Sequence, residues 1–262
     1  GFYERGDTMA RITIAPDQGF QNSNFRVKNL VGSSVVTVTS EDKGKLWVSG
    51  SHPSTFVTVF DAANLNQERR VNLNGVLESF QQGDKLFLLT AGNLYKYNLN
   101  SGKLRKRVKS DLGDFTCFKV EEGANRIWIG SRSGLILCEN GVVRKLFETE
   151  PLLRHRVNGI DIANGTVYLA TIGGGMVMIS GNKVWNITAK DGLASDMCNA
   201  VTIDDDDYVW LSTTHGLSKI SIRGKNKIVN FTSYNGLLSD EVDKVVVQDS
   251  LIWVKNDNGI SV

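Results

Sequence analysis

The sequence contains three histidines, His52, His155 and His215, which are the side chains best suited to proton transfer or metal binding. They lie far apart, without the short spacings that bring histidines to one metal ion. No Gly-x-Ser-x-Gly motif is present, and the glycine triplet 173–175 lies between two predicted strands and not before a helix, where phosphate binding requires it. We therefore predict no catalytic residue, no metal site and no cofactor, and expect that the protein is not an enzyme.

Two charged stretches could suggest other chemistry, and each has a simpler interpretation. The aspartates at 204–207 lack the D-x-D-x-D-G spacing of a calcium loop, so we interpret them as a solvated hairpin turn. The basic stretch 103–109 falls on a predicted outermost strand, where charges prevent edge-to-edge pairing. With 30 basic and 28 acidic residues, the net charge of +2 provides no general attraction for nucleic acid.

The remaining polar candidates lie in predicted loops. His52, His215 and Arg132 each follow an aromatic strand, whereas His155 lies between two arginines in a connection between repeats. Such a group, with Asp196 and Asp240 nearby, suits a hydroxyl-rich or anionic ligand. The alternative is that these residues are scattered surface charge and that the two aspartates cap turns. The candidate ligand-binding residues are Arg132, Arg154, His155, Arg156, Asp196, His215 and Asp240.

An internal repeat determines where these loops lie. Six segments share an aromatic residue within a short apolar run, at intervals of 40, 41, 40, 42 and 43 residues. The six aromatic residues are Trp47, Phe87, Trp128, Tyr168, Trp210 and Trp253. A turn-forming residue precedes each aromatic by three positions, and a glycine follows most of them by five or six. The turn formers are Gly44, Asp84, Asn125, Gly165, Asp207 and Ser250, and the glycines are Gly92, Gly134, Gly174, Gly216 and Gly259.

Each repeat contains about four short strands and no convincing helical periodicity. In the third repeat, for example, the pattern predicts strands at Thr116–Val120, Leu135–Cys138 and Val143–Phe147 around the aromatic strand. Four antiparallel strands per 40–45 residues are typical of a β-propeller blade, in which the aromatic side chain fills the space between neighbouring sheets. In a propeller, the loops named above emerge on one face.

We predict an all-β chain forming a single β-propeller domain over residues 1–262, as a fragment of a longer protein. Its four-stranded antiparallel blades number about six, or form an incomplete seven-bladed ring. In the six-bladed arrangement, Phe2–Glu4 and Met9–Ile14 complete the blade of Trp253. The three cysteines, Cys117, Cys138 and Cys198, are expected to be buried. The sequence contains no run of 18 apolar residues, so we predict no membrane-spanning segment in it.

Two repeats carry a more specific pattern. The segment DGLASD at 191–196 precedes a strand that ends near Asp204, the Trp210 strand, and then Gly216-Leu217; the segment NGLLSD at 235–240 opens the next repeat in the same way. This pattern resembles the regulator-propeller repeat of the periplasmic sensor regions of bacterial hybrid two-component system histidine kinases.

The resemblance implies a periplasmic or cell-surface sensor propeller that responds to oligosaccharides. It also implies a homodimer and attachment to the remainder of a membrane-bound sensor. The same repeat resembles propellers of a cell-surface secretion apparatus, so a structural or protein-binding role is the alternative. Nucleic acid is not an expected partner.

Overall fold

A computed structural model shows antiparallel sheets joined by short turns. It describes residues 2–5, 8–15, 19–25, 35–42, 45–50, 56–61, 67–71, 73, 75–111, 114–121, 123–222, 227–248 and 251–262, with side chains described from residue 71 to 247 and from 251 onward. Within these ranges the strands form seven sheets, five with four strands and two with three. This confirms the predicted all-β fold of four-stranded antiparallel sheets.

The chain divides into two compact units, and the first comprises Gly1–Asp111. Its sheets contain β1 (Phe2–Arg5), β2 (Thr8–Ala15) and β3 (Gly19–Phe25); β4 (Val35–Asp42), β5 (Lys45–Gly50), β6 (Phe56–Asp61) and β7 (Gln67–Val71); and β8 (Val76–Gln82), β9 (Lys85–Thr90), β10 (Asn93–Asn98) and β11 (Leu104–Lys109). Strand β11 lies at the edge of its sheet, and its Arg105, Lys106 and Arg107 are exposed. The basic stretch is therefore an edge strand, as predicted.

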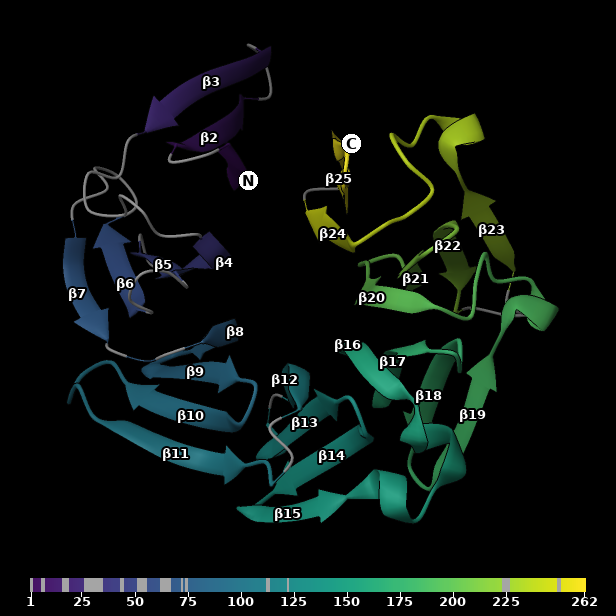
Figure 1. Cartoon of the computed structure of the whole chain (residues 1–262), viewed down its shortest axis with the longest axis horizontal. Coiled ribbons are helices and arrows are strands. Elements are labelled where there is room, and N and C mark those ends of the chain that lie inside the picture. The colour runs from purple at the N-terminus through teal and green to yellow at the C-terminus, as the bar shows by residue number, and fades with distance from the viewer. Residues whose placement is uncertain are drawn as a thin grey trace. The chain divides into compact units, whose positions relative to one another are not determined.

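The second unit, Leu112–Val262, contains four successive sheets. They comprise β12 (Phe115–Glu121), β13 (Arg126–Ser131), β14 (Gly134–Glu139) and β15 (Val142–Lys145); β16 (Arg156–Ala163), β17 (Thr166–Ile172), β18 (Met176–Ser180) and β19 (Lys183–Ile187); β20 (Cys198–Ile203), β21 (Tyr208–Thr213), β22 (Gly216–Ser221) and β23 (Ile228–Phe231); and β24 (Lys244–Gln248), β25 (Leu251–Asn256) and β26 (Gly259–Ser261). Within this unit the first strands of successive sheets, β12, β16, β20 and β24, contact one another in sequence (Figure 1).

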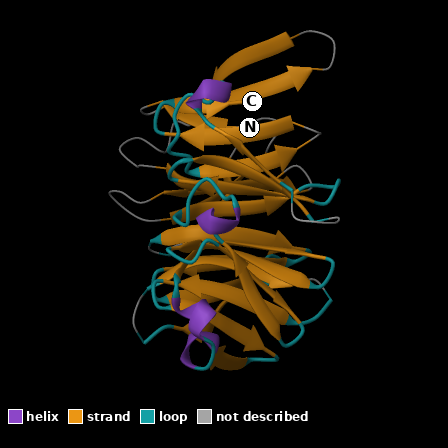
Figure 2. Cartoon of the chain, turned by 90° about the vertical axis from the view of Figure 1, so that its right-hand side faces the viewer, coloured by secondary structure: helices purple, strands orange, loops and turns teal. Residues whose placement is uncertain are grey.

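Within the described ranges, helices are limited to short 3-10 turns in the connections between sheets of the second unit (Figure 2). They are η1 (Leu146–Glu148), η2 (Pro151–Arg154), η3 (Ala189–Asp191) and η4 (Ser233–Asn235). The predicted strand Val143–Phe147 ends at Lys145, because Phe147 lies in η1. Among the residues described, no helix is long and apolar enough to cross a membrane.

Each end of the chain contributes a three-stranded sheet to its own unit. Strands β1 and β2 pair with β3 in a sheet of their own, and β24–β26 form another. The sequence analysis missed β3 because its Gln21, Asn22 and Asn24 obscure an alternating apolar pattern. The described strands form seven sheets, and the choice between the two predicted blade numbers stays a prediction, because it depends on how the ring closes.

Three of the predicted turn formers before the aromatic strands adopt the expected backbone conformation, and Gly44 and Ser250 lie outside the described residues. Asn125, Gly165 and Asp207 all have positive φ, at 49°, 70° and 63°. In the Phe87 repeat this conformation falls one residue earlier, on Gly83 with φ of 57°. Tight hairpins need such left-handed residues, which asparagine, aspartate and glycine tolerate best.

The glycine after each aromatic strand lies in a hydrogen-bonded turn, but two predicted positions are wrong by one residue. Ser131 Oγ donates to the Gly134 carbonyl and Thr213 Oγ1 to the Gly216 carbonyl, both at 2.8 Å. In the Tyr168 repeat the acceptor is Gly175 and not Gly174, because that turn is one residue longer. In the Phe87 repeat the acceptor is Asn93, which follows Gly92.

The aromatic residues of the second unit fill the spaces between sheets. Trp128 packs with Val167 and Ile179 of the following sheet, and Trp210 packs with Val245 and Val254 of the next. Tyr168 is likewise 4% exposed within the cluster between its sheet and that of β20–β23. This confirms the predicted wedge for these three repeats, whereas Trp253 in the last sheet is only half-buried.

The three cysteines are buried, as predicted. Cys117 lies between the first and second sheets of the second unit, and Cys198 between the second and third. Burial raises the pKa of the Cys198 thiol to about 12. The thiol therefore stays protonated at neutral pH and behaves as a small apolar side chain.

A β-bulge near the start of β12, β16 and β20 forms a repeated link that the sequence analysis did not predict. The pairing skips one residue in β12, β16 and β20, namely Thr116, Asn158 and Asn199. Thr116 Oγ1 donates to the Val157 carbonyl, Asn158 Nδ2 to the Cys198 carbonyl at 3.5 Å, and Asn199 Nδ2 to the Val242 carbonyl at 3.0 Å. Each bulge thus directs a polar side chain to the next sheet's backbone.

Replacing Asn199 with leucine is expected to lower the free energy of unfolding by about 1–3 kcal/mol, because the carbonyl of the buried Val242 loses its donor. Asn158→Leu is the matched control, with a smaller expected loss because its bond is at the distance limit. Urea unfolding followed by tryptophan fluorescence measures both values. Equal stability of Asn199→Leu and the unmodified protein would show that the bulge does not link the sheets.

Candidate functional site

The connections that contain η3 and η4 have the same internal structure. Thr188 and Asp191 form a capping box around η3, and Gly192 ends it with φ of 112°. Thr232 and Asn235 do the same around η4, where Gly236 has φ of 100°. Sequence similarity between the two DGLASD-type segments therefore reflects a shared turn.

Asp196 and Asp240 stabilise these turns. Asp196 Oδ1 accepts the Ala189 N–H, and Asp240 Oδ1 accepts the Ser233 N–H, each at 2.6 Å. Hydrogen bonds from Ser233 hold the pKa of Asp240 below its usual value, with a smaller contribution from the nearby charge of His215. Turn capping was one of the two roles that the sequence allowed for these aspartates. One oxygen of each carboxylate has that role.

The His155 side chain and the Asp196 backbone carbonyl both contact the turn between β17 and β18. The Gly173 and Gly175 N–H groups donate to the Asp196 carbonyl at 2.9 and 3.2 Å. The imidazole of His155 lies against the same turn, since a Cβ added to Gly174 would stand 2.5 Å from His155 Cδ2. The close contact explains why glycine occupies this position.

A second group forms around His215, which is exposed in the turn between β21 and β22. Its Nδ1 lies 3.0 Å from Thr214 Oγ1, which in turn lies 3.1 Å from Ser195 Oγ. Two hydroxyl groups and an imidazole therefore meet where the DGLASD segment approaches the β21–β22 turn.

Two of the three arginines donate side-chain hydrogen bonds to local acceptors. Arg154 Nε donates to the Phe147 carbonyl at 3.0 Å, and Arg156 Nε to Asn158 Oδ1 at 2.8 Å. Arg132 is exposed in the turn between β13 and β14, where its backbone N–H donates to the Asp114 carbonyl. None of these hydrogen bonds joins an arginine to the histidine or aspartate side chains of the two connections.

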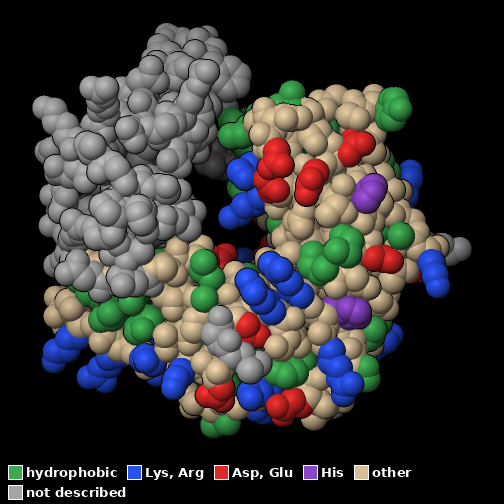
Figure 3. Space-filling model, viewed as in Figure 1, with side chains coloured by type: hydrophobic (Ala, Val, Ile, Leu, Met, Phe, Trp, Pro, Cys, Tyr) green, Lys and Arg blue, Asp and Glu red, His purple; other side chains and the backbone are tan. Residues whose placement is uncertain are grey.

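The sequence analysis missed Tyr234, the most exposed large hydrophobic side chain among those described. It lies in η4 and is 97% exposed. The equivalent residue of η3 is Lys190, so comparing the two DGLASD-type turns could have revealed an aromatic side chain at a solvent-facing position. We define the connection face as Ser195, Asp196, Thr214, His215, Tyr234, Asp240 and His155. Figure 3 shows two histidine side chains with acidic groups near them on one side of the molecule.

Two other sequence candidates have simpler roles or lie outside the described residues. Asp204 accepts the N–H groups of Asp206 and Tyr208 and the indole Nε1–H of Trp210, the last at 2.7 Å. It is therefore a hairpin acceptor, and no group of three potential metal ligands occurs in the part of the chain that the structure describes. His52 lies outside the described residues.

Comparison with known proteins identifies the fold. No protein-family model matches the chain, and no curated protein matches it in sequence. The extracellular domain described as part of a hybrid two-component system of B. thetaiotaomicron is 22% identical to it, with a TM-score of 0.74, over 87% of this chain and 32% of that one. Virginiamycin B lyase from Staphylococcus aureus is 12% identical, with a TM-score of 0.73, over 97% of this chain and 86% of the lyase. The chain has the β-propeller fold.

A second extracellular domain described as part of a B. thetaiotaomicron hybrid two-component system covers 99% of this propeller and is 16% identical, with a TM-score of 0.72. The propeller spans about a third of the length of the two sensor chains, 32% and 37%. These neighbours belong to the class of protein that the sequence resemblance indicated. At such identities the similarity establishes the fold, which sensors and a lyase share.

Proposed function

We propose that this propeller is an extracytoplasmic ligand-sensing or interaction module of a two-component regulator, located in the periplasm or at the cell surface. The observation that carries the proposal is the structural similarity to an extracellular domain of a two-component system over 87% of the chain. The DGLASD-type turns that resemble the regulator-propeller repeat provide independent support. The remainder of the membrane-bound sensor and a second copy of the chain are the proposed partners.

The proposed ligands are oligosaccharides, bound at the connection face. Their hydroxyl groups both donate and accept hydrogen bonds, as do the Thr214 hydroxyl and the His215 imidazole. The ring of Tyr234 offers an exposed surface for the apolar face of a sugar. Binding would favour one of two arrangements of a dimer, since a ligand shifts an equilibrium only through its different affinities for the two states.

The role is proposed to be binding and not catalysis. His155 lies in the connection before β16, whereas His215 lies in the turn after β21, so they belong to different sheets. His215 Nδ1 contacts the Thr214 hydroxyl and not a carboxylate that could orient the ring as a general base. The lyase similarity, at 12% identity, shows only the fold.

Isothermal titration calorimetry of the full chain against a panel of oligosaccharides tests this proposal. Saturable binding of at least one oligosaccharide is expected, with a Kd on the order of 1 µM to 1 mM. Short peptides of matched length are the control ligands. Absence of oligosaccharide binding together with saturable peptide binding would contradict the proposal and favour a protein-binding propeller.

A further inference from the structure

A pocket of about 260 Å³ lies between the sheets β12–β15 and β16–β19. Its floor is apolar and consists of Trp128, Leu137, Val167 and Ile179. It opens beside the turns that contain Gly165 and Gly181, where an added Cβ would meet no atom within 4 Å. These turns are at the strand ends opposite to the connection face, so the pocket is separate from the site proposed above.

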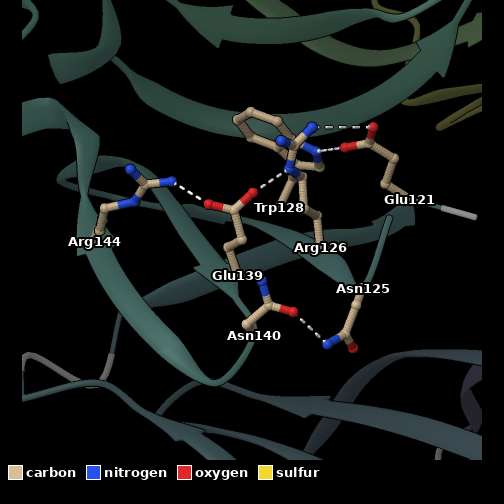
Figure 4. A network of polar contacts seen from close by, with 7 residues as sticks. All are labelled: Glu121, Asn125, Arg126, Trp128, Glu139, Asn140 and Arg144. Atoms are coloured by element: carbon tan, nitrogen blue, oxygen red, sulfur yellow. Dashed lines mark hydrogen bonds and ion pairs between the residues drawn. The ribbon is translucent and has the colours of Figure 1, made fainter. Parts of the chain in front are cut away.

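One wall of the pocket carries two positive and two negative side chains (Figure 4). Arg126 Nε and Arg144 NH2 both contact Glu139, at 2.5 Å from its two carboxylate oxygens. Arg126 NH1 lies 3.6 Å from Glu121, whose other oxygen accepts the Trp128 indole N–H at 2.8 Å. The four charges sum to zero, and the arginine side chains are 42% and 54% exposed, so solvent and solutes can reach them.

The repeat provides an internal comparison, because the strand pairing aligns each wall residue with one in the next sheet. The residues equivalent to Glu121, Arg126, Glu139 and Arg144 are Ala163, Thr166, Ser180 and Trp185. Trp185 packs against the apolar cluster that joins its sheet to the following one. The fold therefore forms at this position without charges, and the charged wall of the sheet β12–β15 is not repeated in the sheet that follows it.

We infer that this pocket binds a free α-amino acid with an apolar side chain. The carboxylate of a zwitterion can pair with the guanidinium groups of the wall, and its ammonium group can pair with the glutamates. No charge is then left unpaired. An anion alone would displace Glu139 from its arginines, and a cation alone would displace an arginine from its glutamates. The ligand's apolar side chain would cover the floor formed by Trp128 and its neighbours.

The test is calorimetric titration of the full chain with L-leucine, N-acetyl-L-leucine and L-leucine methyl ester. Leucine is expected to bind with a Kd on the order of 0.1–1 mM, and each blocked derivative about tenfold more weakly, because each lacks one of the two charges. Equal or tighter binding of either derivative, or binding of neutral monosaccharides but not leucine, would overturn the inference.

Two variants locate the binding without relying on the derivatives. Glu139→Gln keeps the size of the side chain and is expected to weaken leucine binding about tenfold. Asp243→Asn is the matched control, since it removes one charge from the Asp243–Lys255 pair outside the pocket and should leave the Kd unchanged. If Glu139→Gln lowers the melting temperature, Arg144→Met provides a second variant at the exposed end of the wall. Unchanged leucine affinity in both wall variants would overturn the inference.

Discussion

Replacing Gly134 with alanine is expected to lower the free energy of unfolding by about 2–5 kcal/mol. Gly134 has φ of 129°, and an added Cβ would stand 2.1 Å from the Leu153 carbonyl oxygen and 2.6 Å from Phe147 Cβ. The left-handed backbone costs an L-residue about 1–2 kcal/mol, and forcing a methyl group into a packed site costs about 1–3 kcal/mol. The Leu153 carbonyl belongs to η2, so the connection cannot move without disturbing its sheet.

Gly141→Ala separates these two causes. Gly141 lies in the β14–β15 turn of the same sheet, with φ of 84°, and an added Cβ would meet nothing within 4 Å. This variant should therefore lose only about 1 kcal/mol, from backbone strain alone. Urea unfolding of both variants gives the comparison. Equal losses would show that the connection does not pack against Gly134 as described.

Replacing Trp210 with alanine is expected to cost about 3–5 kcal/mol, the usual range for a large aromatic side chain in a core. The side chain is 4% exposed, its ring stacks on Phe231 with centroids 6.0 Å apart, and it packs against Val245 and Val254 of the next sheet. Thermal unfolding by calorimetry, combined with urea unfolding, measures the loss.

Two further variants test the cause. Trp210→Phe keeps most of the packing and loses the hydrogen bond to Asp204, so about 1–2 kcal/mol is expected. Trp253→Ala removes the aromatic residue at the same repeat position in the last sheet, where it is only half-buried. Its effect should be less than half that of Trp210→Ala. A larger effect at Trp253 would contradict the wedge role assigned to Trp210.

The repeat was predictable because it depends on short-range chemistry. Aromatic residues at regular intervals, left-handed turn formers such as Asn125 and Asp207, and alternating apolar strands each act within a few residues of one another. The β17–β18 turn was placed one residue early because Gly173, Gly174 and Gly175 are equivalent in sequence, and only the packing of Ile187 and His155 distinguishes them.

The site was less predictable because it depends on contacts between repeats. The aspartates of the connections were correctly placed in turns, but nothing local shows that Ser195 approaches Thr214 or that Asn199 reaches Val242. The pocket wall joins Glu121, Arg126, Glu139 and Arg144 from four strands. Each looks like an ordinary surface charge in the sequence, and only the pairing register brings them together.

The proposed function depends most directly on where an oligosaccharide binds. The decisive measurement is the Kd of the best oligosaccharide for three variants, Tyr234→Ala, His215→Ala and Arg144→Ala, by calorimetric titration. Loss of one stacking or hydrogen-bonding group should weaken binding about five- to tenfold in the first two variants, and leave it unchanged in the third. Unchanged affinity in both connection-face variants, with weaker binding in Arg144→Ala, would contradict the account.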